Sequence, residues 1–152
     1  MQHRTIAALF LGISLCIGSA SAQEKGFGLG VILGEPTGIS GKLWNGRTTA
    51  FNGAVAWSFE KNNAFHLHLD HVFHNQKIIE VEKGRLPVYY GIGGRVRFDD
   101  DDVRIALRIP VGINYQFADA PVDLFFEIVP LLDLIPSTEF DFNGGIGVRY
   151  FF

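Results

Sequence analysis

The sequence has few of the features that define several common classes of protein. Its single cysteine, Cys16, leaves no partner for a disulfide within the chain. Lysine and arginine total 13 against 16 aspartate and glutamate, so there is no basic excess for binding nucleic acid. Beyond the first 22 residues, no apolar run approaches the ~18 residues that a transmembrane helix requires. Disulfide scaffolds, nucleic-acid-binding proteins and helical membrane proteins are therefore excluded.

The first 22 residues have the pattern of a cleavable secretory signal peptide. Arg4 supplies a positive charge, Ile6–Ile17 forms a short apolar run, and Ala20–Ala22 provides the small residues of a cleavage site. We expect a signal peptide over residues 1–22, cleavage before Gln23, and one domain over residues 23–152.

Cys16 lies inside the apolar run of this signal. Lipidation of Cys16 is the alternative, but Leu15 stands where a lipoprotein signal has a small residue. We therefore interpret Cys16 as one more apolar residue of the signal, and the exported chain as free of thiol chemistry.

Apolar and polar residues alternate over most of the remaining chain. From Val103 to Phe117 every odd position is apolar, and the even positions are charged, small, amide-bearing or proline. Residues 139–152 repeat the alternation, which is typical of strands with one apolar face. Turn signals divide the chain into eight expected strands: 26–33, 38–44, 49–59, 64–74, 86–98, 103–117, 122–132 and 139–152.

An even number of strands joined by short turns predicts an all-β fold, an eight-stranded antiparallel up-and-down transmembrane β-barrel. Asn45-Gly46 is a strong signal for one of its hairpins. Pro110 cannot donate to the strand ladder, so we expect a bulge there. Side chains fill the interior of a barrel of this size, which argues against a wide pore.

Alternation alone does not distinguish a membrane barrel from a soluble one. The apolar face is aliphatic in the middle of the strands and aromatic at their ends, as at Tyr115 with Phe117 and at Trp57 with Phe59. The other face is rich in glycine and carries charges. This grading favours a lipid-facing belt with aromatic girdles around a narrow polar lumen. The alternative is a soluble periplasmic, lipocalin-like ligand-binding barrel.

The C-terminus carries a pattern known from outer-membrane barrels. Ile146, Val148 and Tyr150 precede the terminal Phe152 at every second position, which resembles the signal read by the barrel-insertion machinery. The plan over residues 26–152 resembles OmpX and the OmpA transmembrane domain. The stretches LGEPTGISGK, LPVYYGIGGR and PVGINYQF resemble a family of small exported bacterial barrels for which no catalytic motif is known.

The resemblance implies a location in the cell outer membrane of a Gram-negative-type bacterium. Its implied partners are outer-membrane lipids, lipopolysaccharide and the insertion machinery. We expect a monomer with a structural or interaction role, without catalysis, cofactor, metal or nucleic acid. The loops are shorter than the protruding loops of OmpX-type adhesins, which argues against adhesion.

The charges on the inward face predict a network of ion pairs in the lumen, because an unpaired buried charge costs several kcal/mol. Alternation places Arg108 at the height of Glu127 and Arg149 at the height of Asp123. A third group of arginines is expected near Asp141. The expected network consists of Arg95, Arg97, Arg104, Arg108, Asp123, Glu127, Asp141 and Arg149.

Two further clusters were weighed as sites. His66, His68 and Asp70 share one face of the strand at 64–74, about 6 to 7 Å apart along it, a spacing that suits a metal or a His-Asp pair. The alternative function is thus a lipid-modifying outer-membrane hydrolase, disfavoured because no serine sits beside these histidines. Asp99–Asp102 is interpreted as a solvated turn, with cation bridging to lipopolysaccharide as the alternative.

Overall fold

The computed structural model describes residues 26–58, 63–100 and 102–152. The expected signal peptide with its cleavage point before Gln23 lies outside these ranges, and so do Phe59 and Asp101. The regular elements are strands: β1 (Gly26–Glu35), β2 (Thr37–Trp44), β3 (Thr49–Ser58), β4 (Ala64–Asn75), β5 (Val88–Phe98), β6 (Val103–Arg108), β7 (Val111–Gln116), β8 (Val122–Ile135) and β9 (Glu139–Phe151).

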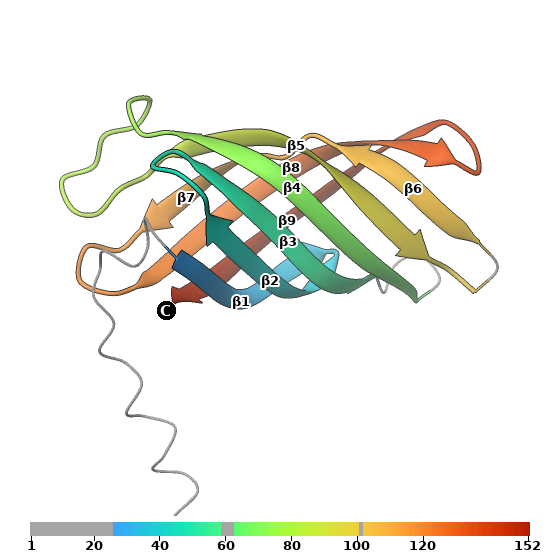
Figure 1. Ribbon diagram of the computed structural model, residues 1–152, viewed down its shortest axis with the longest axis horizontal. Coiled ribbons are helices and arrows are strands. Elements are labelled where there is room, and N and C mark those ends of the chain that lie inside the picture. The colour runs from blue at the N-terminus through green and yellow to red at the C-terminus, as the bar shows by residue number, and fades with distance from the viewer. Residues whose placement is uncertain (1–25, 59–62, 101) are drawn as a thin grey trace, which may run out of the picture.

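The strands form a closed antiparallel ring, in which β6 and β7 share one position (Figure 1). β1 pairs with β2 and also with β9, from Gly28 opposite Phe151 to Glu35 opposite Gly144. The expected all-β, up-and-down fold is confirmed. If the directly paired residue is followed from each strand to the next around the ring, the path returns to β1 roughly ten residues from the residue where it began. This stagger means that the strands are tilted against the axis of the ring.

The expected strand at 103–117 is divided into β6 and β7 by Pro110, which has no N–H to donate. The expected bulge at Pro110 is wrong, because the register against β5 is the same on both sides of it. A register shift lies instead between Ile105 and Ala106, against β8. Two hydrogen bonds of 3.0 Å, from Ile109 N to Pro130 O of β8 and from Gly91 N of β5 to Pro110 O, keep residues 109 and 110 in place between β5 and β8.

Side chains point alternately into and out of the ring, as the pleat of a strand requires. On β4, His66 and Asp70 are 1% exposed, whereas Leu69 between them is 60% exposed. No helix among the described residues is long and apolar enough to cross a membrane. The outward side chains form what we call the outer belt, which includes Leu29, Val31, Ile39, Leu43, Val55, Leu67, Leu69, Ile92, Ile113, Leu124, Phe126, Ile128, Ile146 and Val148.

The connections alternate between two ends of the ring (Figure 1). The terminus end carries Gly26, Phe152, the turns at 45–48 and 117–121, and the segment 76–87; the far end carries 99–102 and 136–138. The segment 76–87 is the longest connection among the described residues. Most of the described irregular chain therefore gathers at the terminus end.

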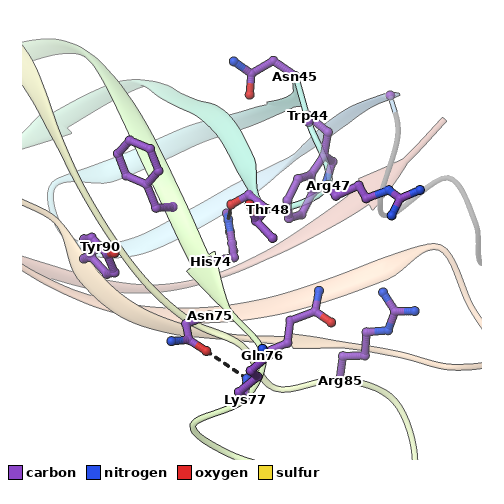
Figure 2. A pocket seen from close by; sticks show the side chains of 13 residues that line it. Trp44, Asn45, Arg47, Thr48, His74, Asn75, Gln76, Lys77, Arg85 and Tyr90 are labelled. Atoms are coloured by element: carbon purple, nitrogen blue, oxygen red, sulfur yellow. Dashed lines mark hydrogen bonds between the residues drawn. The ribbon is translucent and has the colours of Figure 1, made fainter.

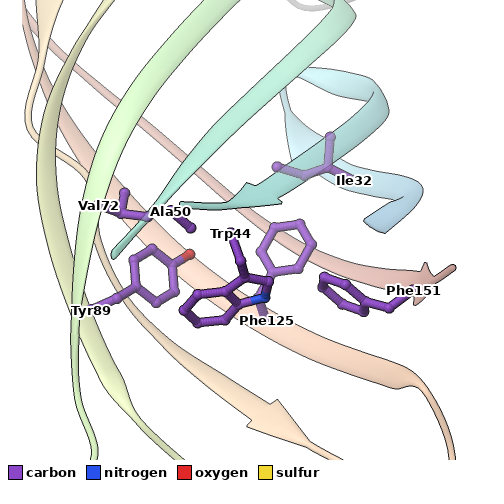
Figure 3. Close-up of a cluster of buried hydrophobic side chains, with 7 residues drawn as sticks. All are labelled: Ile32, Trp44, Ala50, Val72, Tyr89, Phe125 and Phe151. Atoms are coloured by element: carbon purple, nitrogen blue, oxygen red, sulfur yellow. The ribbon is translucent and has the colours of Figure 1, made fainter. Parts of the chain in front are cut away.

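Inside the ring, apolar side chains pack toward the terminus end and form what we call the aromatic cluster (Figure 3). Its members are Ile32, Trp44, Ala50, Val72, Tyr89, Phe125 and Phe151. The Phe125 ring occupies the space that a side chain at position 147 would need, so Gly147 is required there. A smaller cluster of Ala106, Val129 and Leu131 lies on β6 and β8, nearer the far end.

Candidate functional site

The inner face of the ring gathers the charged residues of the strands. Arg95, Arg108 and Arg149 are each 1% exposed. Strand alternation explains their burial, because every second side chain of each strand must enter the ring. Charges withdrawn from water in this way require partners.

The middle of the inner face is organised around Arg108 on β6. Its Nε donates to Asp70 Oδ1 at 2.9 Å, and its Nη2 donates to Asp70 Oδ2 at 3.1 Å. Glu127 Oε1 lies 3.8 Å from the same Nη2, and Tyr89 donates its hydroxyl to Glu127 Oε2 at 2.7 Å. The expected meeting of Arg108 with Glu127 is therefore present at 3.8 Å, but Asp70 on β4, which the expected network did not include, makes the closer, bidentate pair across Gly93 of β5.

Toward the terminus end, the structure brings Arg149 and Asp123 together. Arg149 Nε donates to Asp123 Oδ1 at 3.0 Å, and Nη2 donates to Oδ2 at 3.1 Å. The guanidinium carbon also lies 4.1 Å from the centroid of the Phe125 ring. Backbone register explains the meeting, because Asp123 on β8 is directly opposite Arg149 on β9.

A second polar group at this end was missed from the sequence. Lys42 Nζ lies 2.7 Å from His74 Nε2 and 4.4 Å from the centroid of the Trp44 ring. Lys42 is fully buried and shares its inward face with Ser40 and Trp44. That shared parity along residues 40–44 is the signal by which the sequence could have assigned Lys42 to the inner face.

Toward the far end, two arginines bind carboxylates that the expected network did not include. Arg95 Nη2 donates to Asp133 Oδ1 at 2.8 Å, and Arg97 Nε donates to Asp99 Oδ1 at 3.0 Å. Both aspartates were expected in turns, and these arginines were expected near Asp141. Asp141 is half-buried, and its Oδ1 accepts a hydrogen bond from the backbone N of Phe142 at 2.8 Å.

Arg104 lies at the rim of the same end. Its side chain is one-third exposed, and its nearest carboxylate oxygens are those of Asp99 at 3.6 Å and Asp133 at 3.9 Å. Ser58 also donates a hydrogen bond to Glu35 at this end. The far end is thus a loose charged mouth, in contrast to the bidentate pairs deeper in the ring.

The histidines of the alternative hydrolase site lie in the inner face without catalytic partners. Both ring nitrogens of His66 and Nδ1 of His68 have no hydrogen-bond partner among the described residues. Both carboxylate oxygens of Asp70 are bound by Arg108. Within the described ranges, no group of three His, Cys, Asp or Glu residues is placed to hold a metal ion.

The residues of the expected assembly signal lie on the last strand and its end. Ile146 and Val148 belong to the outer belt, and Tyr150 is half-buried. Phe152 is 65% exposed, and its backbone N donates to Phe27 O at 3.0 Å. The aromatic side chain of Phe152 is therefore free for contact with another molecule, while its backbone is tied to β1.

A pocket of about 1090 Å³ opens at the terminus end (Figure 2). The turn at 45–48 and the chain leaving β4 after His74 form its walls. Trp44 and His74 line it from within the ring, and Tyr90 lines it from the outer face. It is therefore a mouth that joins the inner face to the outer surface.

The closed antiparallel ring with a charged interior and an apolar exterior defines a small β-barrel protein. The chain belongs to the family described as Protein of unknown function (DUF3996), whose model matches residues 18–151. Its fold is similar to the crystal structure of the N-terminal β-barrel domain of Pseudomonas aeruginosa OprF. The TM-score is 0.59 at 14% identity, over 83% of this chain and 95% of that one. No curated protein matches the sequence.

Proposed function

We propose that this chain is an exported outer-membrane β-barrel protein with a structural or interaction role and no catalytic activity. The observation that carries the proposal is that the exterior of the barrel is apolar and its interior is charged, the reverse of a soluble protein. Leu69, Ile92 and Ile128 are each more than half exposed on the outer belt, while Arg95, Arg108 and Arg149 are buried inside. A soluble lipocalin-like barrel has the opposite arrangement, because its exterior must face water.

The outer belt is costly in water and stable in lipid. Large contiguous apolar surfaces are rare on soluble monomers and indicate contact with a membrane or a partner. A barrel also satisfies every backbone hydrogen bond without water, which is the requirement for spanning the hydrocarbon layer. The short connections at the far end support a compact role in the membrane more than a role as an adhesin.

The inner face supports a closed barrel. The pairs Arg108 with Asp70 and Arg149 with Asp123 lie on the inner face at two heights, and the aromatic cluster fills the space beside them. Eight strands leave an interior that side chains just fill. We therefore propose that the barrel is a monomer whose interior does not conduct bulk solutes.

A substitution on the outer belt tests the membrane location directly. Leu69→Arg should lower the free energy of unfolding in lipid by about 2–4 kcal/mol, the cost of a cation at mid-membrane depth. Ile78→Arg is the matched control, because Ile78 is equally exposed (61% against 60%) but lies in the segment 76–87. Urea unfolding in lipid vesicles, with folding followed by heat-modifiable gel mobility, measures both variants.

Equal tolerance of Leu69→Arg and Ile78→Arg, together with recovery of the chain in the soluble periplasmic fraction, would overturn the proposal. The soluble ligand-binding barrel would then take its place. Density fractionation of the host's membranes supplies the second readout without any substitution.

The absence of catalysis has its own test. If His66 and His68 only fill the interior, His68→Gln should leave the acyl pattern of the host's lipid A unchanged in mass spectra. The unpartnered ring nitrogens and the capture of Asp70 by Arg108 support that outcome. A changed pattern, reproduced by Asp70→Asn, would instead support the lipid-modifying hydrolase.

A further inference from the structure

The pocket at the terminus end carries a concentration of positive charge. Arg47, Lys77 and Arg85 line it, and among the described residues of its lining none carries a carboxylate. The chain as a whole has a net charge of −3, so this local excess is not a consequence of composition. Figure 2 shows Arg47 reaching the pocket from the turn after β2, and Lys77 and Arg85 reaching it from the segment 76–87. A site of this charge favours an anion.

Trp44 supplies an independent observation that points to a ligand. Its side chain is only 7% exposed, and its indole Nε1 has no hydrogen-bond partner among the described residues. Buried donors in proteins are nearly always bonded to an acceptor. Trp44 lines the pocket, so an oxygen of a bound anion can accept this bond once the indole turns its N–H, which has almost no exposed surface, toward the opening. Lys42, 4.4 Å from the indole ring, adds a buried positive charge behind it.

The opposite side of the pocket is apolar and faces outward. Phe73 and Tyr90 line it, with their rings stacked at a centroid distance of 5.9 Å. Both side chains lie on the outer face, 38% and 55% exposed, and continue the outer belt toward the terminus end. The pocket thus joins a cationic mouth to an aromatic outer surface, which suits a molecule with an anionic head and an apolar tail.

We propose that this pocket binds the phosphate headgroup of an anionic phospholipid, with the acyl chains lying over Phe73 and Tyr90. The inference rests on the membrane location proposed above and names a lipid site within it. Arg47 and Lys77 bind the phosphate oxygens, and the Trp44 indole donates to the headgroup. A free phosphate ion would satisfy the cations and the indole, but it would make no use of the stacked aromatic pair.

Native mass spectrometry of the folded chain tests the site. The chain is released from micelles containing equal amounts of phosphatidylglycerol and phosphatidylcholine with the same acyl chains. We expect phosphatidylglycerol to be retained roughly tenfold more than phosphatidylcholine, and the double variant Arg47→Gln/Lys77→Gln to lose roughly that tenfold preference. Lys83→Gln is the matched control, because Lys83 lies in the same segment but its Nζ pairs with Asp119 at 2.5 Å outside the pocket.

A second variant keeps the test decisive if the double variant folds poorly. Trp44→Phe retains the ring and removes only the unpartnered N–H, and we expect about a threefold loss of phosphatidylglycerol retention. Heat-modifiable gel mobility confirms folding in each case. Equal retention of the two lipids, or an equal loss in Lys83→Gln, would overturn the inference. Displacement of the lipid by millimolar inorganic phosphate would assign the pocket to the free ion instead.

The inference and the proposed function fail in different ways. A chain that inserts into membranes but retains both lipids equally contradicts only the lipid site. A chain recovered as a soluble protein contradicts the membrane location, whatever its lipid selectivity in micelles.

Discussion

The two halves of the barrel interior are built on different principles. In the half toward the terminus end, the Arg149–Asp123 pair is bidentate and packs against Phe125 within the aromatic cluster. In the half toward the far end, Arg95 makes one bond to Asp133 and leaves its Nε and Nη1 unpartnered among the described residues. His66, beside them, has neither ring nitrogen bonded.

This difference indicates where water enters. A fully bonded pair among aromatic rings needs no solvent, whereas unpartnered buried donors are normally satisfied by ordered water. The surroundings of the Arg149–Asp123 pair are therefore the dry half of the interior, apart from the pocket and the unpartnered Trp44 Nε1 at its rim, and the surroundings of Arg95 are the hydrated half. The comparison teaches that equal burial does not imply an equal contribution to stability.

The largest expected effect comes from breaking the dry half. Asp123→Ala should lower the free energy of unfolding by about 4 kcal/mol, because Arg149 is left buried without a partner. Asp133→Ala removes the single hydrogen bond of the buried Arg95 to Asp133 and should cost only about 1–2 kcal/mol, since ordered water can bind the donors that Arg95 already leaves unpartnered. Urea unfolding in detergent or lipid measures both. Equal losses would show that the two halves are equally dry.

A smaller effect is expected at the boundary between the halves, where Arg108 lies between two acidic residues. A double-mutant cycle should give a coupling of about 2–3 kcal/mol between Arg108 and Asp70, and at most about 1 kcal/mol between Arg108 and Glu127. The reason is geometric: Asp70 makes the bidentate pair, and Glu127 lies 3.8 Å away and is bound by Tyr89. The reverse order of the two couplings would mean that Glu127 is the true partner.

The smallest effect on stability is expected outside both halves, at the chain end. Phe152→Ala should change the free energy of unfolding of the purified chain by less than about 0.5 kcal/mol, because the ring is 65% exposed. In cells the same variant should reduce the folded amount in the outer membrane, since the terminal aromatic is proposed to act in delivery. Quantitative immunoblots of folded and unfolded bands measure it, and unchanged abundance would count against an assembly signal.

Much of the fold follows from alternation, because a strand's period of two decides which side chains enter the ring. The same parity puts Asp123 and Arg149 on the inner face, and the short turn at 136–138 between β8 and β9 limits the registers in which they can pair. Parity says nothing, however, about which residues meet across the interior. Asp70 and Arg108 flank Gly93 in one row of β4, β5 and β6, and they meet because Gly93 has no side chain between them, a match of three registers that the sequence does not show.

The remaining differences have equally local causes. The expected strand ends at residue 132 and leaves Asp133 in the following turn, yet β8 continues to Ile135 and places Asp133 inside. At Pro110 a bulge was expected, because proline has no N–H to donate to the strand ladder. The neighbouring strands instead tolerate the missing bond without a shift, since the Pro110 and Pro130 carbonyls still accept hydrogen bonds.

The seam between β1 and β9 has a consequence for biogenesis. It joins segments separated by roughly a hundred positions in sequence, so the entropy of closing that loop opposes its formation until late. Before the final strand arrives, β1 and the last formed strand each expose an unpaired edge, which invites pairing with other chains. An unfolded or truncated chain is then an aggregation hazard in transit, and closure of the seam between β1 and β9 is the step that removes both edges.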